Sequence, residues 1–177
     1  MGNSSSSLST SQIEEFTSIS KFSPKEIKRL YRRFRRLDRN NDGTLTQEEF
    51  LSLPELATNP LRDRVLQLFH LNQRDNITFK TFISTLNVFS SKADKHEKLK
   101  AAFAIYDIDG DGVINNIDLT KIVRMLVGQT LSTSQVDQVV IKTMSEADID
   151  GDGVLSFEEF AKTMSSVDLE MKMSIKF

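Results

Sequence analysis

Apolar side chains recur every three or four residues over several stretches of the chain, and this spacing predicts amphipathic helices. One stripe consists of Ile27, Leu30, Tyr31, Phe34 and Leu37, and another of Leu119, Ile122, Val123 and Leu126. Polar segments rich in Asp, Asn and Gly interrupt the pattern between the stripes. The sequence therefore predicts an all-α chain in which helices alternate with acidic loops.

Capping signals mark where these helices begin and end. Residues 23–26, Ser-Pro-Lys-Glu, place Ser at the N-cap, Pro at the first helical position and Glu at the third. The same capping-box spacing recurs at 94–97 and 132–135, and Gly128 is suited to end the helix that precedes it. We therefore expect helices to start directly after residues 23, 94 and 132.

Four segments of the chain superimpose on one another without gaps. They are DRNNDGTLTQEEF (38–50), HLNQRDNITFKTF (70–82), DIDGDGVINNIDL (107–119) and DIDGDGVLSFEEF (148–160), with first residues 32, 37 and 41 positions apart. We call the first twelve residues of each segment the first, second, third and fourth loop. The repeat predicts eight helices in four helix–loop–helix units, paired into two lobes with short β contacts between loops.

The loops have the ligand spacing of a calcium site. Calcium takes six to eight oxygens, and a twelve-residue loop supplies them from positions 1, 3, 5, 7, 9 and 12, with a sharp turn at position 6 that favours Gly. The predicted ligands, with position 7 acting through its backbone carbonyl, are Asp38, Asn40, Asp42, Thr44, Thr46 and Glu49 in the first loop, Asp107, Asp109, Asp111, Val113, Asn115 and Asp118 in the third, and Asp148, Asp150, Asp152, Val154, Ser156 and Glu159 in the fourth. Three matches in register predict three Ca²⁺ sites.

The third loop differs from the other two at its closing position. Asp118 is one methylene shorter than the Glu that closes the first and fourth loops. It reaches an ion less easily with both oxygens, so we expect this loop to bind calcium more weakly or to be more tolerant of Mg²⁺.

The second loop keeps the length of a site without its ligands. His70, Arg74 and Thr81 stand at positions 1, 5 and 12, and Asp75 replaces the turn glycine. Ile77, at position 8, aligns with the apolar residue of the other loops and is suited to a short strand contact. We interpret the second loop as inactive, retained as the packing partner of the first.

Composition narrows the classes of function. The chain has 177 residues, a formal net charge of −2, no cysteine and two histidines. Disulfides and thiolate metal sites are impossible, a basic nucleic-acid binder is not indicated, and no nucleophile–base pair or phosphate-binding Gly-rich loop is visible. We therefore predict a cytoplasmic protein that is not an enzyme.

The predicted organisation has four parts. A flexible acylated leader (1–22) precedes an N-terminal lobe (23–91), a C-terminal lobe (92–166) and a tail (167–177). Apolar and polar residues alternate in the tail, which predicts an extended segment on an apolar surface. Flexible methionines, such as Met125, Met144, Met164, Met171 and Met173, suit a groove that receives an amphipathic helix of a target.

Several further segments resemble the calcineurin B family of the EF-hand superfamily. They are LPELATNPL (53–61), KLKAAFAIYDIDGDG (98–112), VRMLVGQ (123–129) and the start MGNSSSS. The resemblance covers essentially the whole chain. It implies a calcium-binding regulatory subunit that binds a target helix, most simply the catalytic subunit of a calcineurin-type Ser/Thr phosphatase.

The resemblance leaves two subfamilies open, and a calcium buffer is a third alternative. The inactive second loop, RLYRRF (29–34) and the tail look more like calcineurin B homologous proteins, which are cofactors of sodium–proton exchangers. The intact first loop departs from that group, whose first two loops are typically inactive. Calcineurin B usually has four working loops, so the inactive second loop departs from that template.

The amino terminus matches the pattern for N-myristoylation. Gly2 is the acceptor and Ser6 stands at the required position. One acyl chain binds a bilayer only marginally, and a basic stripe on the predicted helix after residue 23 is a candidate second signal. We expect reversible association with a membrane surface. The stripe consists of Lys25, Lys28, Arg29, Arg32, Arg35, Arg36 and Arg39.

Overall fold

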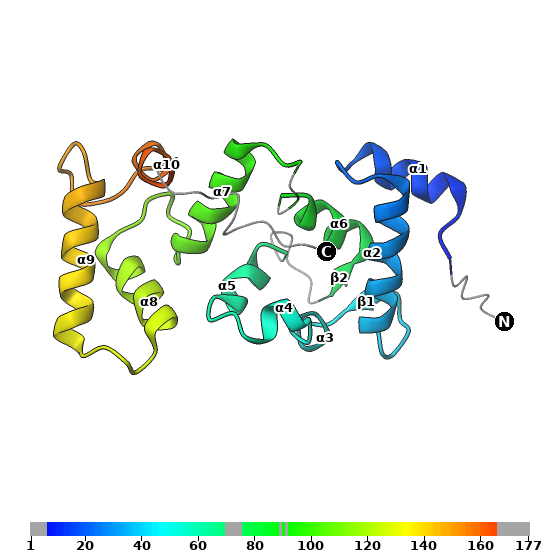
Figure 1. Cartoon of the computed structure of the whole chain (residues 1–177), viewed down its shortest axis with the longest axis horizontal. Coiled ribbons are helices and arrows are strands. Elements are labelled where there is room, and N and C mark those ends of the chain that lie inside the picture. Colours follow the sequence, from blue (N-terminus) through cyan, green and yellow to red (C-terminus); the bar gives the residue numbers. More distant parts are fainter. Residues whose placement is uncertain (1–6, 70–75, 89, 91, 166–177) are drawn as a thin grey trace. The chain divides into compact units, whose positions relative to one another are not determined.

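The computed structural model describes residues 7–69, 76–88, 90 and 92–165 (Figure 1). In chain order the elements are α1 (Thr10–Ser18), α2 (Pro24–Leu37), β1 (Thr44–Leu45), α3 (Gln47–Leu51), α4 (Pro54–Ala57), α5 (Arg62–Gln67), β2 (Ile77–Thr78), α6 (Phe79–Val88), α7 (Lys95–Tyr106), α8 (Asn116–Val127), α9 (Thr133–Ala147) and α10 (Phe157–Ser165). The predicted all-α class is confirmed. No helix in the described part of the chain is long and apolar enough to cross a membrane.

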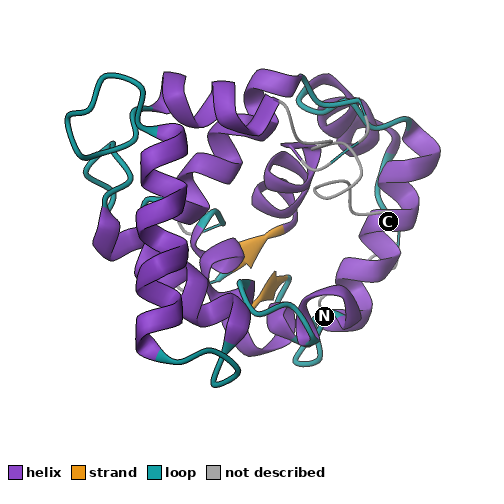
Figure 2. Cartoon of the chain, turned by 60° about the vertical axis from the view of Figure 1, so that its left-hand side comes forward, coloured by secondary structure: helices purple, strands orange, loops and turns teal. Residues whose placement is uncertain are grey.

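The β contacts predicted between loops are present. β1 pairs with β2 in antiparallel register, with Leu45 opposite Ile77 (Figure 2). In the third and fourth loops, Ile114 and Leu155 exchange both backbone hydrogen bonds, at 2.9 and 2.8 Å. Each loop is therefore joined to its neighbour through the apolar residue at position 8.

The chain divides into two compact units by its internal contacts. The first unit runs to Thr58 and resumes at Phe69–Asp94, while the second takes Asn59–Leu68 and continues from Lys95. Residues 59–68, which were expected to belong to the N-terminal lobe, thus pack in the second unit through contacts between α5 and α7. The two helices that flank the second loop, α5 and α6, belong to different units.

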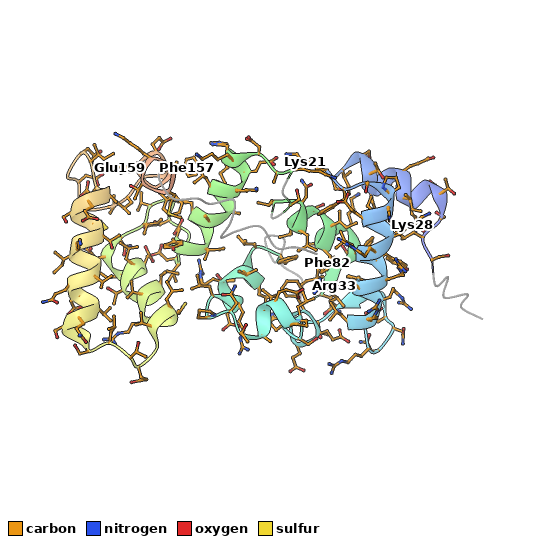
Figure 3. The ribbon with its side chains drawn as sticks, in the orientation of Figure 1. Lys21, Lys28, Arg33, Phe82, Phe157 and Glu159 are labelled. Carbon is orange, nitrogen blue, oxygen red and sulfur yellow. The ribbon has the colours of Figure 1, made fainter. Side chains whose placement is uncertain are left out.

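An aromatic cluster forms the centre of the first unit. Phe34 and Phe82, the latter labelled in Figure 3, are fully buried. The ring of Phe82 packs edge-on against Phe34 with centroids 5.5 Å apart. Phe79 contacts Phe34 in the same manner at 5.3 Å. Aromatic rings bury large apolar areas and prefer such edge-to-face arrangements, so these rings hold α2 against α6.

Helix α1 lies within the segment expected to be a flexible leader. Ser9 and Gln12 form a capping box at its start, with Ser9 Oγ accepting from the Gln12 N–H at 3.2 Å. Phe16 is buried and meets Phe79 edge-on with centroids 5.0 Å apart. The burial of Phe16 therefore attaches residues 10–18 to the core of the first unit.

The second unit is built on aliphatic side chains from α7, α8, α9 and α10. Its buried core consists of Leu99, Ala102, Phe103, Ile114, Leu119, Val136, Val140, Met144, Ala147, Leu155 and Phe160. Phe103 and Phe160, which flank the third and fourth loops, meet in this core with ring centroids 5.4 Å apart. Because Ile114 and Leu155 belong to this core, packing and the β contact reinforce each other.

The helix ends agree with the capping signals. Ser23 and Ser132 cap α2 and α9, and each box is closed by the residue three positions later. Helix α7 begins at Lys95, directly after Asp94. Gly128 ends α8 with φ +57°, a backbone conformation in which a side chain would be strained.

The capping carboxylate of α2 gives a pH-dependent contribution to stability. Glu26 accepts hydrogen bonds from the Ser23 hydroxyl and N–H, both at 2.7 Å, and from Lys92 Nζ at 3.0 Å. These bonds, above all that of the Ser23 hydroxyl, lower the pKa of Glu26 from 4.5 to about 2. A lowered pKa stabilises the folded state above pH 4.5, and this contribution is lost as the pH falls through about 2.

We predict that Glu26→Gln flattens the acid limb of the stability curve. In metal-free protein, the free energy of unfolding of the parent should fall more steeply between pH 5 and pH 2 than that of the variant, as measured by urea denaturation. Glu14→Gln, a change of an exposed residue on α1, is the matched control and should follow the parent. Parallel curves for parent and Glu26→Gln would contradict the role assigned to this carboxylate.

Candidate metal centres

The first residue of each acidic loop is fixed by the backbone of its own loop. In the third loop, Asp107 accepts from the N–H groups of Gly110 and Gly112, at 2.8 and 3.0 Å. In the fourth, Asp148 accepts from the corresponding glycines at 2.7 and 2.9 Å. Both oxygens of the carboxylate are therefore anchored, and the loop wraps around the point at which its other oxygens meet.

Carboxylates gather inside the third and fourth loops. Oxygens of Asp107, Asp109 and Asp118 lie within 4.8 Å of one another, and so do those of Asp148, Asp150 and Asp152. Like charges at this distance repel, so such clusters are most stable around a cation. The donors are all hard oxygens, which fit Ca²⁺ or Mg²⁺ rather than a softer metal.

The closing glutamates of the first and fourth loops reach back across the loop. Glu159 at the start of α10 accepts from the N–H groups of Ile149 (2.8 Å) and Ser156 (2.9 Å), which stand at positions 2 and 9 (Figure 3). Glu49 makes the equivalent bonds to Arg39 and Thr46, at 2.9 and 3.0 Å. Each glutamate thereby joins the start of its loop to the start of the exiting helix.

Hydrogen bonding keeps these glutamates ionised. The Ser156 hydroxyl and the backbone N–H groups around it lower the pKa of Glu159 to about 2. The Thr46 N–H is the main cause of a lowered pKa at Glu49. Both side chains are thus carboxylates at neutral pH, the form that a metal ion requires.

Asp118 closes the third loop differently. It is 1% exposed, accepts from the Asn115 N–H at 3.1 Å, and makes no bond to the N–H of Ile108 at position 2 among the described contacts. Instead its carboxylate joins the cluster with Asp107 and Asp109. The shorter side chain therefore leaves the start and end of this loop less firmly connected.

An arginine of α2 competes with a metal ion for a predicted ligand of the first loop. Arg35, on the last turn of α2, donates to Asp38 Oδ2 at 2.7 Å and to Asn41 Oδ1 at 3.0 Å. Asp38 is itself buried, and its two oxygens also accept from the N–H groups of Asp42 and Gly43, both at 3.1 Å. A metal ion in this loop therefore shares its position 1 ligand with an arginine, a feature the loop motif alone did not reveal.

The ligands at positions 3 and 5 of the first loop are also held internally. Asp42 accepts from the Thr44 hydroxyl at 2.7 Å and from the Asn40 amide at 2.9 Å. The first-loop carboxylates do not form a group of the kind seen in the third and fourth loops, within the described residues. Asn41 takes position 4 with φ +59°, where the other two loops have glycine.

The second loop is described only from residue 76 onward, so His70, Arg74 and Asp75 lie outside the described residues. Its end is visible. Thr81, at position 12, donates its N–H to Thr78 Oγ1 at 3.2 Å, and the two hydroxyls lie 3.0 Å apart. The threonines thus cap α6 without supplying the carboxylate that closes the first and fourth loops.

Comparisons with known proteins agree with this geometry. Family models described as an EF-hand domain pair and an EF hand match residues 96–165 and 23–54, and these two matches leave out the second loop. The calcineurin B protein of Naegleria gruberi is 51% identical over 176 residues, 99% of either chain. The chain belongs to the calcineurin B family.

Two further relatives are similar to this chain over nearly its whole length. The type 1 calcineurin B of Dictyostelium discoideum is 46% identical over 100% of this chain and 99% of its own. The calcineurin B of Yarrowia lipolytica is 43% identical over 93% of this chain and 95% of its own. Members of the calcineurin B family are regulatory EF-hand proteins that bind calcium and have no catalytic centre, so the predicted absence of enzymatic activity is confirmed.

We predict that Asp118→Glu strengthens calcium binding at the third loop by several-fold. The extra methylene lets the carboxylate reach the ion with both oxygens and accept from the Ile108 N–H, as Glu159 does at Ile149. Isothermal titration of parent and variant, each with the first and fourth loops silenced by Glu49→Gln and Glu159→Gln, isolates this site. Equal or weaker binding by the variant would contradict this interpretation of the third loop.

Proposed function

We propose that this chain is the calcium-binding regulatory subunit of a calcineurin-type Ser/Thr phosphatase. The observation that carries the proposal is the 51% identity to a calcineurin B over 99% of both chains. Calcium occupies the first, third and fourth loops through the ligands predicted from the sequence, and the third loop is the one most tolerant of magnesium. The clusters of Asp107 and Asp148 support the last two sites, and the anchored Glu49 supports the first.

Exposed apolar side chains on α8 and α9 support binding of an amphipathic target helix. Leu126 and Ile117 of α8 are 48% and 64% exposed, and Ile141 of α9 is 67% exposed. Met125 is also exposed, whereas Met144 is buried in the core. Of the methionines expected to line a groove, Met171 and Met173 lie outside the described residues, as does the whole predicted tail.

The direct test is the affinity for a purified catalytic subunit of a calcineurin-type phosphatase. We expect tight binding in calcium that weakens on chelation, and at least tenfold weaker binding by Leu126→Glu, because a charge would be buried against the target. Lys142→Glu, an exposed polar position on α9, is the matched control and should bind as the parent does. Binding to a sodium–proton exchanger segment and not to the phosphatase would favour the second subfamily, and binding to neither would favour a calcium buffer.

We also propose that the protein is cytoplasmic and associates reversibly with membranes through a myristoyl group on Gly2. Gly2 lies outside the described residues. Support comes from α2, where Lys28 (labelled in Figure 3), Arg29 and Arg32 are exposed. Ile27 and Leu30 of the same helix are buried, so its basic side chains face solvent. These charges supply the second signal that a single acyl chain needs.

The expected result is that acylated parent binds vesicles containing phosphatidylserine, whereas Gly2→Ala does not. Replacing Lys28, Arg29 and Arg32 with Gln in the acylated protein should weaken binding about a hundredfold at low salt, since each basic residue near an anionic surface contributes about 1 kcal/mol. Arg62→Gln, which removes one exposed positive charge from α5, should bind vesicles as the parent does. Equal binding of all acylated variants would reject the role of α2.

A further inference from the structure

Arg64 of α5 is a buried charged residue that the calcium ligands do not account for. It is 5% exposed, in a helix that precedes the second loop but packs in the second unit. An arginine is almost never buried this completely unless its guanidinium is fully paired. Its contacts therefore indicate what it does.

The guanidinium binds the end of α7 and the beginning of the third loop. Nε donates to Ile105 O at 2.9 Å, and Nη2 donates to Ala104 O at 2.9 Å and to Asp107 O at 2.6 Å. Nη1 reaches Ile108 O at 3.4 Å and also bonds the Gln67 side chain. All four carbonyls belong to the last turn of α7 or to positions 1 and 2 of the loop.

The carbonyls of Ala104 and Ile105 are among those that an α-helix leaves without partners at its C-terminus, where a positive charge is also favourable. Arg64 supplies both the hydrogen bonds and the charge from a separate helix. Its contacts to α7 and the third loop are to main-chain oxygens, in contrast to Arg35, which binds the side chain of a predicted ligand. Metal binding in the third loop therefore does not require Arg64 to leave.

The charge of Arg64 also acts on the ligands of the third loop. Burial lowers the pKa of the guanidinium, and attraction to Asp107 and Asp118 opposes that shift. Both carboxylates are buried, so their field is poorly screened by water. One arginine thus neutralises part of the charge that a calcium ion would otherwise balance.

We propose that Arg64 is a positioning residue that tunes the third loop: it holds residues 104–108 in shape without metal, and its charge weakens calcium binding there. The inference rests on the proposed calcium site at this loop. Because coupling is reciprocal, calcium in the third loop weakens the attachment of α5 by the same factor. Occupancy of the third loop is in this way communicated to the helix that leads into the second loop.

The test compares Arg64→Gln, Arg64→Lys and the control Arg62→Gln in the full-length chain. Arg62 lies on the same helix with its side chain 48% exposed, next to Asp63. Calcium binding is followed by the amide NMR signals of Gly112 and Gly153, which report the third and fourth loops separately in one sample. We expect Arg64→Gln to tighten binding at the third loop by roughly three- to tenfold, the effect of one nearby charge, with the fourth loop unchanged.

Thermal unfolding gives the second readout. Arg64→Gln should lower the Tm of metal-free protein more than that of calcium-loaded protein, and Arg64→Lys should keep the parent's calcium affinity because it keeps the charge. If Arg64→Gln does not fold without metal, the rate of calcium release from loaded protein, measured with a chelator, replaces the affinity and should be slower than in the parent. Unchanged or weaker binding at the third loop, or equal loss of Tm in both states, overturns the proposal, since a mere helix cap predicts that result.

A parent that takes up no calcium at the third loop would overturn the proposed calcium site together with this inference. A parent that binds there while Arg64→Gln and Arg62→Gln behave alike overturns the inference alone.

Discussion

Repulsion among carboxylates held within 4.8 Å of one another in the third and fourth loops is the constraint on which the account of the second unit depends. Each cluster is created by its own loop, because the N–H groups at positions 4 and 6 fix the aspartate at position 1 and turn the chain around it. The helices on either side are oriented by that turn. A divalent ion relieves the repulsion, so metal binding and folding of the loops are coupled.

The second loop, which we propose to be inactive, contributes through packing rather than metal binding. Burying an isoleucine side chain stabilises a protein by roughly 1.5–3 kcal/mol, whereas a net hydrogen bond contributes about 1 kcal/mol. Ile77 is 1% exposed and lies opposite Leu45. Burial of its side chain therefore contributes more to stability than a backbone hydrogen bond of the β1–β2 pair. A loop can lose its ligands and still hold the first loop in place, provided that position 8 stays apolar.

Local signals predicted much of this architecture. The sequence predicted the capping boxes at Ser23 and Ser132, the end of α8 at Gly128 and the pairing of Ile77. Each of these features depends on neighbouring residues or on a fixed loop length. Helix α1 has the same signal at Ser9, but the Ser and Thr residues around it are typical of a flexible leader and obscure the helix.

The two arginines illustrate what local signals cannot predict. Arg35 pairs with Asp38 three residues later, a spacing typical of helices, but the calcium motif assigns Asp38 to metal. Arg64 bonds carbonyls some 40 residues away. Nothing in its neighbours distinguishes it from Arg62, because its burial follows from the packing of α5 against α7. The partners of a long side chain depend on the tertiary fold, which neighbouring residues in the sequence do not specify.

The most direct measurement of the central claim is the number of calcium ions that the metal-free, full-length chain binds. Isothermal titration, with native mass spectrometry to count the ions, should give three per chain and a large rise in Tm on saturation. Saturation at two ions or fewer, or uptake of a fourth ion, would contradict the assignment of three oxygen sites and one scaffold loop.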